Sequence, residues 1–308
     1  MRLRTHSRMY DAVIIGAGIA GQSAAIYAAR KRMDFLLLAK EIGGQFLESG
    51  EVLNYPGIVK TTGVEFSSIM ERQMEFNGVK PKIEAVKKIE KIKNGFKVKT
   101  DKSDYETQAV IIATGSHPRK LNVPGEAKFA KKGVTYCSIC DGPLFSGMDI
   151  AILGGGNSAL EAVDFTHKIA RKIYLINIGK DFNAHEYLIE RVKSFRNVEI
   201  INEAKTTEIL GNRLVNGIKY KQGGKEHILK VQGVIIEIGR VPETDFVRGF
   251  VKLGEHGHIR IDCWGRTSVE GVFAAGDCAD GQEYQYVISA GQGVMALLKA
   301  ARYLANKA

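Results

Sequence analysis

The chain has 308 residues, of which 44% are hydrophobic and 25% are charged, with 34 glycines and six prolines. These fractions are those of an ordinary globular protein, and they exclude a largely disordered, collagen-like or disulfide-scaffold chain. The net charge is +10, but no nucleic-acid-binding motif accompanies it, so we expect a solvated basic surface and no nucleic-acid partner.

The first predicted elements are an apolar strand over residues 11–15, a glycine turn and an alanine-rich helix. The turn reads Gly16-Ala17-Gly18-Ile19-Ala20-Gly21, and another apolar strand is expected over 35–39. A G-x-G-x-x-G turn between strand and helix is typical of a dinucleotide-binding unit, because its glycines let the backbone approach a pyrophosphate at the helix N-terminus.

The uncharged stretch 12–29 is nearly long enough to span a membrane. The glycines in its middle favour the strand, turn and helix instead, and no convincing targeting signal precedes it. We therefore expect a cytoplasmic protein that does not associate with membranes.

The same pattern recurs later in the chain. A strand over 149–153 is followed by Gly154-Gly155-Gly156-Asn157-Ser158-Ala159, a helix over 160–169 and a strand over 172–178. Two such units predict two nucleotide sites, unless the second copy serves packing alone.

Two crossings connect these units. Ala113-Thr114-Gly115-Ser116 ends one apolar strand, and residues 238–244 end another. They predict a discontinuous first domain, 1–116 and 242–308, with a second domain, 117–241, inserted in it. The expected fold class is α/β, with two Rossmann-like dinucleotide-binding domains, the second inserted in the first.

Four cysteines occur, at positions 137, 140, 263 and 278. Cys137 and Cys140 have the C-x-x-C spacing, which closes a small disulfide and often lowers the pKa of one thiol. A zinc site would need two further ligands at short spacing, so no metal is expected, and Cys263 and Cys278 are expected to be buried. Asp141 follows the pair and can exchange protons with the thiols. A redox pair between two dinucleotide units indicates electron flow from cofactors to a disulfide.

Together with residues 43–45, 54–57 and 267–277, these motifs resemble the low-molecular-weight thioredoxin reductases of bacteria and archaea over essentially the whole chain. The resemblance implies a homodimeric, FAD-dependent thioredoxin-disulfide reductase. Electrons would pass from a nicotinamide or other donor through FAD and the Cys137–Cys140 disulfide to thioredoxin or a thioredoxin-like protein. An alternative on the same fold is a ferredoxin/NAD(P)H oxidoreductase or an NADH oxidase, which would not need the two cysteines.

The resemblance also implies site residues. Cys137 and Cys140 would be the redox disulfide, and Asp141 would be its proton donor and acceptor. The residues implied to bind FAD are Gly16, Gly18, Ala20, Gly21, Gly44, Gln45, Asn54, Thr114, Gly115, Gly276, Asp277, Gln285, Tyr286 and Val287. Those implied to bind a nicotinamide nucleotide are Gly154, Gly156, Asn157, Ser158 and Lys180. Lys40 and Glu41 stand where a contact to the FAD ribose is expected.

One departure from the family leaves the electron donor open. Typical members follow the second nucleotide strand with His-Arg-Arg, which binds the 2′-phosphate of NADPH, whereas this chain has Asn177-Ile178-Gly179-Lys180. A pair of guanidinium groups binds phosphate better than one lysine. The acidic residue that favours NADH is absent too. NADPH, NADH and a ferredoxin therefore remain alternative donors.

Overall fold

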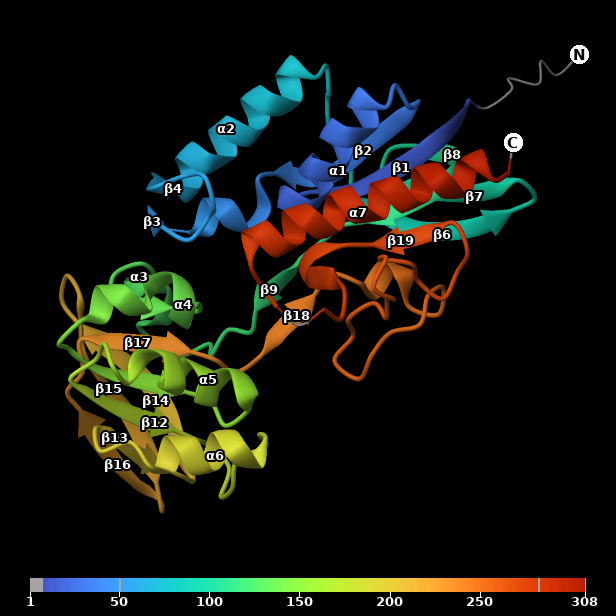
Figure 1. Cartoon of the computed structure of the whole chain (residues 1–308). Helices are drawn as coiled ribbons and strands as arrows, with labels where there is room; N and C mark the ends of the chain where they lie inside the picture. Colours follow the sequence, from blue (N-terminus) through green and yellow to red (C-terminus); the bar gives the residue numbers. More distant parts are fainter. Residues whose placement is uncertain (1–7, 50, 282, 308) are drawn as a thin grey trace, which may run out of the picture. The chain divides into compact units, whose positions relative to one another are not determined.

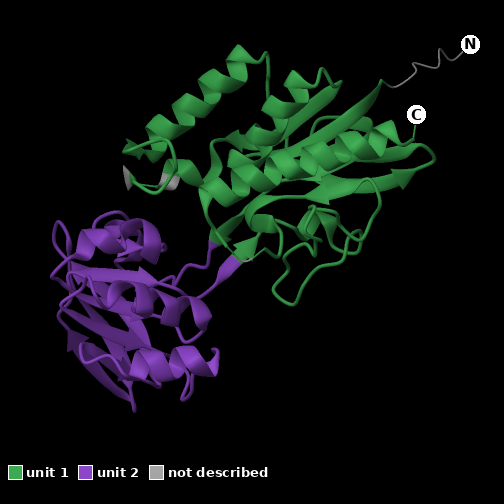
Figure 2. Ribbon diagram, in the orientation of Figure 1, with its two compact units in different colours: residues 1–117, 241–308 green, residues 118–240 purple. Residues whose placement is uncertain are grey.

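The computed structural model describes residues 8–49, 51–281 and 283–307. The chain divides into two units, which Figure 2 colours separately. Unit 1 consists of residues 1–117 and 241–308, and unit 2 consists of residues 118–240. The α/β fold class with an inserted second domain is confirmed.

Unit 1 contains a sheet in the order β5-β2-β1-β8-β7-β6, with β19 paired to β8. The strands are β1 (Met9–Ala17), β2 (Phe35–Ile42), β5 (Lys82–Ile83), β6 (Val86–Ile92), β7 (Gly95–Thr100), β8 (Asp104–Ile112) and β19 (Val272–Ala274). Pairing is parallel from β5 through β8 and to β19, and antiparallel among β6, β7 and β8. The centre of β1 is a continuous buried apolar run because both faces of the sheet are covered.

Three helices share one hydrophobic core with this sheet: α1 (Ile19–Arg30), α2 (Gly63–Phe76) and α7 (Tyr286–Ala305). Figure 1 shows α1 and α7 packed side by side. Gly293 permits this approach, because a Cβ there would lie 2.0 Å from the carbonyl oxygen of Ala20. The start of α7 is thereby placed beside the first glycine turn.

The remaining short elements of unit 1 are the strands β3 (Glu51–Val52) and β4 (Thr61–Thr62) and the 3₁₀ helices η1 (Gly44–Glu48), η3 (Asp245–Val247) and η4 (Gly276–Cys278). The two segments that join the units are β9 (Ser116–Pro118) and β18 (Arg240–Pro242), which pair with each other as a two-stranded sheet.

Unit 2 is built on a parallel sheet in the order β10-β17-β11-β12-β13. Its strands are β10 (Val134–Thr135), β11 (Asp149–Leu153), β12 (Lys172–Ile176), β13 (Val198–Ile201) and β17 (Gly233–Ile236). An antiparallel sheet of β14 (Ala204–Gly211), β15 (Val215–Gln222) and β16 (Lys225–Leu229) completes one core. The helical segments are α3 (Glu126–Phe129), α4 (Ser138–Asp141), η2 (Gly142–Phe145), α5 (Asn157–Thr166) and α6 (Glu186–Lys193). Helices α5 and α6 belong to a second core of the unit.

Two predicted boundaries in unit 2 were wrong. The strand predicted over 172–178 ends at Ile176, because the side chain of Asn177 accepts a hydrogen bond from Gly179 N–H and donates one to the Asp181 carbonyl, which turns the chain. The helix predicted over 160–169 ends at Thr166, and the Asn197 amide hydrogen-bonds the carbonyl of His167 just beyond it. In the described part of the chain, no helix combines the length and the apolar character that crossing a membrane requires.

Candidate cofactor and redox sites

A cavity of about 640 Å³ lies in unit 1 at the carboxyl ends of β1, β2 and β8. Residues that follow β19 and residues at the start of α7 complete its wall. Ligands of parallel α/β sheets bind at the carboxyl ends of the strands, and this volume is typical of a cofactor site.

The first glycine turn shapes this cavity. Gly16 has φ +106°, and a Cβ there would lie 2.2 Å from the Ala113 carbonyl oxygen. A Cβ at Gly21 would lie 1.8 Å from the Gly16 carbonyl oxygen. A Cβ at Gly18 would meet no atom within 4 Å, and Gly18 lines the cavity. The turn is therefore closed on the protein side and open on the cavity side, as a dinucleotide phosphate requires.

Most residues of the predicted FAD set line the cavity: Gly16, Gly18, Ala20, Gly44, Gln45, Thr114, Gly115, Gly276, Asp277 and Tyr286. Gly21 packs behind the turn, and Val287 is 41% exposed at the start of α7. Asn54 donates a hydrogen bond to the Gln285 side chain at 3.1 Å, so these two residues lie together without lining the cavity.

The beginning of α7 holds Asp277 in place. The Ser289 hydroxyl donates to Asp277 Oδ1 at 3.0 Å, and the Gly276 N–H donates to Gln292 Oε1 at 2.7 Å. The Tyr286 hydroxyl donates to the Gln45 carbonyl at 3.2 Å, which connects α7 to η1. These contacts fix one carboxylate at the cavity wall.

Further charged residues line this cavity, and the sequence singled out only Lys40 and Glu41 among them. Lys40 Nζ lies 3.6 Å from Glu243 Oε2, and His117 Nδ1 lies 3.2 Å from Glu243 Oε1. Glu84 and Lys87 also line the cavity. Lys40 and Glu41 carried a sequence signal, their place directly after the strand predicted over 35–39, and the structure extends that strand to Ile42. The other residues carried none, because they arrive from distant segments of the chain.

The redox centre is in unit 2. Cys137 and Cys140 form a disulfide with a Cα–Cα distance of 5.3 Å, and the Cys140 N–H donates to Cys137 Sγ at 3.2 Å. Asp141 is partly buried and accepts a short hydrogen bond from the Thr135 hydroxyl, which in turn accepts from the Cys137 N–H at 3.2 Å. The Thr135 hydroxyl thereby connects the Asp141 carboxyl group to the backbone N–H of Cys137.

Burial raises the pKa of Asp141 above the ordinary value of 3.8, although the Thr135 hydrogen bond and nearby Lys131 act in the opposite direction. Desolvation disfavours the charged carboxylate. Asp141 therefore retains a proton at higher pH than an exposed aspartate, which suits a proton donor to a thiolate.

The second glycine turn lies against the loop that follows β12. A Cβ at Gly154 would lie 2.2 Å from the Glu237 carbonyl oxygen, and one at Gly155 would lie 2.2 Å from Asn177 Oδ1. Gly156 forms a bridge with Asn183, and Asn157 Oδ1 accepts from the His185 N–H at 2.8 Å. Ser158 and Lys180 are exposed.

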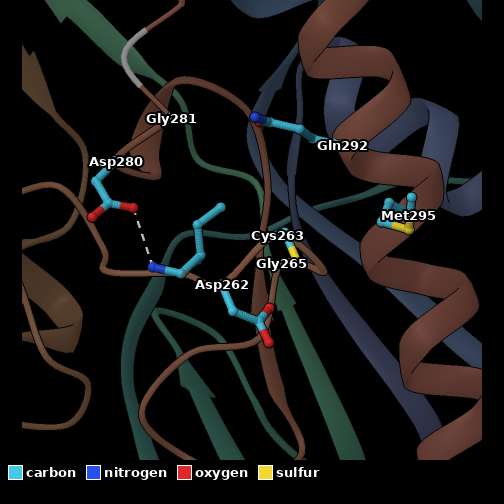
Figure 3. A pocket seen from close by; sticks show the side chains of 8 residues that line it. Asp262, Cys263, Gly265, Asp280, Gly281, Gln292 and Met295 are labelled. Carbon is cyan, nitrogen blue, oxygen red and sulfur yellow. Dashed lines mark hydrogen bonds between the residues drawn. The ribbon is translucent and has the colours of Figure 1, made fainter.

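The other two cysteines differ from each other. Cys278 is buried, as predicted, and burial raises the pKa of its thiol. The prediction that Cys263 is buried was wrong: it is exposed in a separate hollow of about 390 Å³. Figure 3 shows this hollow between α7 and a loop that contains Ile261. The Ile261 N–H donates a hydrogen bond to Asp280 Oδ1 at 3.1 Å. The hollow contains none of the predicted redox or cofactor residues.

Comparison with known proteins gives one consistent result. Residues 10–303 match the family described as pyridine nucleotide-disulphide oxidoreductase. The chain is 40% identical over 304 residues to a component of the alkyl hydroperoxide reductase of Staphylococcus aureus strain MSSA476, covering 96% of this chain and 59% of that protein. It thus spans about three fifths of the length of this curated relative.

Solved structures are similar as well. Thioredoxin reductase from Streptococcus pyogenes MGAS5005 has a TM-score of 0.90 and 33% identity, with 97% of this chain and 99% of that chain covered. A ferredoxin-flavin thioredoxin reductase from Clostridium acetobutylicum has a TM-score of 0.55 and 32% identity, with 97% and 99% covered. The predicted family is confirmed: the chain belongs to the pyridine nucleotide-disulphide oxidoreductases, and it is similar in sequence and fold to the low-molecular-weight thioredoxin reductases.

Proposed function

We propose that this protein reduces the disulfide of thioredoxin or of a thioredoxin-like protein, with electrons passing through FAD and the Cys137–Cys140 disulfide. The observation that carries the proposal is the disulfide itself, closed beside a partly buried carboxyl group. An oxidoreductase without a disulfide substrate would not need this pair. Thioredoxin reductase structures of nearly the same chain length support the proposal.

The unit 1 cavity fits FAD. The open side of Gly18 and the adjacent N-terminus of α1 would bind the pyrophosphate, and Asp277, oriented by Ser289, would accept hydrogen bonds from the ribityl hydroxyls. When bound, FAD supplies two-electron transfer to a disulfide. The role of unit 1 is to bind and orient it.

The residues of unit 2 would carry out the thiol chemistry. Two electrons break the Cys137–Cys140 bond, one sulfur takes a proton, and the other is left as a thiolate. Asp141 would give that proton, and would take it back when the dithiol reduces the disulfide of the partner protein. Its connection through Thr135 to the backbone N–H of Cys137 supports this role. The thiolate attacks the partner disulfide, and a mixed disulfide forms and resolves.

For the electron donor, one observation favours a protein such as ferredoxin over NADPH. The Asn177 side chain accepts from Gly179 N–H and donates to the Asp181 carbonyl and to Asn202 Oδ1, at 3.0, 3.1 and 3.2 Å. Asn177 therefore fixes the loop rather than offering a donor to a nucleotide, and its neighbour Ile178 is 70% exposed. A similar structure is a ferredoxin-flavin thioredoxin reductase. We further propose a homodimer, as the family resemblance implies, located in the cytoplasm, as the sequence predicts.

The test is an anaerobic reduction of the FAD-loaded protein with NADPH, NADH and reduced ferredoxin in parallel. Loss of the flavin absorbance identifies the donor, and alkylation of thioredoxin thiols measures product. Cys137→Ser and Cys140→Ser should each abolish thioredoxin reduction and keep flavin reduction, whereas the matched variant Cys263→Ser should retain both. Thioredoxin reduction by either Cys137→Ser or Cys140→Ser would contradict the proposal.

A further inference from the structure

Glu126 is a buried carboxylate that neither the sequence motifs nor the proposed chemistry uses. It is 4% exposed, at the start of α3. Its Oε1 accepts hydrogen bonds from the Leu121 N–H at 2.9 Å and from the Tyr136 hydroxyl at 2.8 Å, and its Oε2 accepts one from the Asn122 N–H at 2.6 Å. These donors replace the water that a buried carboxylate loses. Glu126 therefore connects the loop after β9 to the residue directly before Cys137.

The Tyr136 side chain is fixed at two points. Lys120 Nζ lies 4.0 Å from the centre of its ring, and its hydroxyl donates to Glu126. A cation over an aromatic ring and a hydrogen bond to a carboxylate both restrict the orientation of a side chain. Because Cys137 is the next residue in the chain, these contacts also restrict the position of the first cysteine of the redox pair.

The preceding residue, Thr135, is bound to the other side of the redox pair. Its hydroxyl donates to Asp141, which follows Cys140, and accepts from the Cys137 N–H at 3.2 Å. The Asp141 N–H also donates to the Cys137 carbonyl at 3.1 Å. Asp141 thus attaches α4 to the end of β10, whereas Glu126 attaches the residue after β10 to α3.

We propose that Glu126 is a positioning residue of the redox pair, which acts through the Tyr136 hydroxyl to hold Cys137 where its sulfur can bond to that of Cys140. The inference rests on the proposed redox role of the two cysteines. Two electrons and one proton open the disulfide to a thiol and a thiolate, and closure reverses this step. Glu126 would favour the closed disulfide over the open pair.

The physical reason is the effective concentration of one sulfur toward the other. When the disulfide is open, closure depends on how often the two sulfurs come within bonding distance. A cysteine whose neighbour is fixed to the protein samples fewer positions away from its partner than one on a free segment. Loss of the Tyr136 hydrogen bond should therefore make the disulfide easier to reduce.

Tyr136→Phe separates this role from a general contribution to the fold. It removes the hydroxyl alone, and it keeps the aromatic ring under Lys120 and the two backbone hydrogen bonds to Glu126. Tyr174→Phe is the matched control, because the Lys172 Nζ lies 4.6 Å from the centre of that ring as well. Tyr174 is in β12, which β17 and β11 separate from β10 in the sheet.

The experiment equilibrates the FAD-loaded wild type and the variants in dithiothreitol redox buffers at pH 7. Alkylation and mass spectrometry then measure the fraction of open Cys137–Cys140 disulfide. The equilibrium constant for reduction should rise about three- to tenfold in Tyr136→Phe, which is up to about 30 mV for a two-electron couple. Tyr174→Phe should keep the wild-type value.

Glu126→Gln provides a second variant, because the amide nitrogen of glutamine accepts no hydrogen bond. It should shift the equilibrium in the same direction as Tyr136→Phe. The double variant should shift it by less than the sum of the two single shifts, since both remove the same contact. If one of the two variants does not fold, the other decides.

A wild-type equilibrium constant in Tyr136→Phe or in Glu126→Gln would overturn the inference, and so would an equal shift in Tyr174→Phe. A residue that only stabilises the fold would change urea unfolding of the protein and leave this equilibrium as it is. The readout does not use turnover. A failure of the proposed function, seen as thioredoxin reduction without the cysteines, is therefore distinct from a failure of this inference.

Discussion

Gly16 and Gly18 stand two positions apart in one turn, but a methyl group would affect them differently. At Gly16 the backbone has φ +106° and a Cβ would overlap Ala113, whereas Gly18 has φ −77° and faces open space. We expect Gly16→Ala to lower the free energy of unfolding by at least about 1–3 kcal/mol, since it adds steric overlap to backbone strain.

Gly18→Ala should change the stability of the FAD-free protein by no more than about 1 kcal/mol, as expected for a helix N-cap position. It should lower FAD content, because the methyl group enters the cavity. Denaturant unfolding of the FAD-free variants and the FAD-to-protein ratio after purification are the measurements. Equal FAD content in Gly18→Ala and wild type would contradict the proposed pyrophosphate site.

Asp141 should make stability depend on pH in an identifiable direction. Its pKa is raised in the folded protein, so the folded state holds a proton that the unfolded state releases above the ordinary pKa of 3.8. The corresponding stabilisation is complete below that value and is lost as pH rises through the folded pKa. The free energy of unfolding of Asp141→Asn, relative to wild type, should therefore increase with pH over this window, as measured by urea unfolding. If this difference in the free energy of unfolding does not change with pH, burial does not raise the pKa of Asp141.

At the scale of elements, the segment after β12 is where the family resemblance puts the contact to the 2′-phosphate of NADPH. Ile178, which stands in place of the arginine that the resemblance implies, is 70% exposed. We expect Ile178→Arg to tighten NADPH binding by about tenfold, or 1.4 kcal/mol, through a charge-assisted hydrogen bond to the 2′-phosphate. NADH affinity should be unchanged in calorimetric titrations, and Ile178→Gln is the neutral control. A low-micromolar Kd for NADPH in the unmodified protein would refute this interpretation of β12.

The glycine turns and their flanking strands could be predicted from the sequence because tight backbone packing leaves a local signature. Gly16 and Gly21 must be glycines since a Cβ would overlap a carbonyl oxygen. The ends of β12 and α5 could not be predicted, because side-chain hydrogen bonds from Asn177 and Asn197 end them. Apolar periodicity does not report such bonds.

Site residues that are neighbours in the sequence could be predicted, whereas site residues from distant segments could not. The C-x-x-C pair and Asp141 are contiguous, so they were visible in the sequence. Glu243 comes to the unit 1 cavity from the distant second crossing, and only tertiary structure brings it there. Cys263 was misjudged because an isolated cysteine carries no pattern, and the average burial of its residue type does not determine its position.

At the scale of the whole molecule, we expect one tightly bound FAD per chain. The unit 1 cavity is built by both segments of that unit, from Gly16 near its start to Ser289 in α7. Denaturation should release FAD and protein in a ratio of about one to one. Release of FMN alone, or of FAD at well below this ratio from the reconstituted protein, would contradict the assignment.

The pairing of β9 with β18 has a consequence for how this chain can be cut and rejoined. The chain leaves unit 1 and returns to it through neighbouring strands, and the apolar cores of unit 2 are formed by its own residues. Residues 118–240, expressed alone, should therefore unfold in a single cooperative transition and retain the Cys137–Cys140 disulfide. Non-cooperative melting of that fragment would refute this. A module bounded in this way is exchangeable: recombination at these two neighbouring strands can replace the inserted unit while unit 1 is inherited intact.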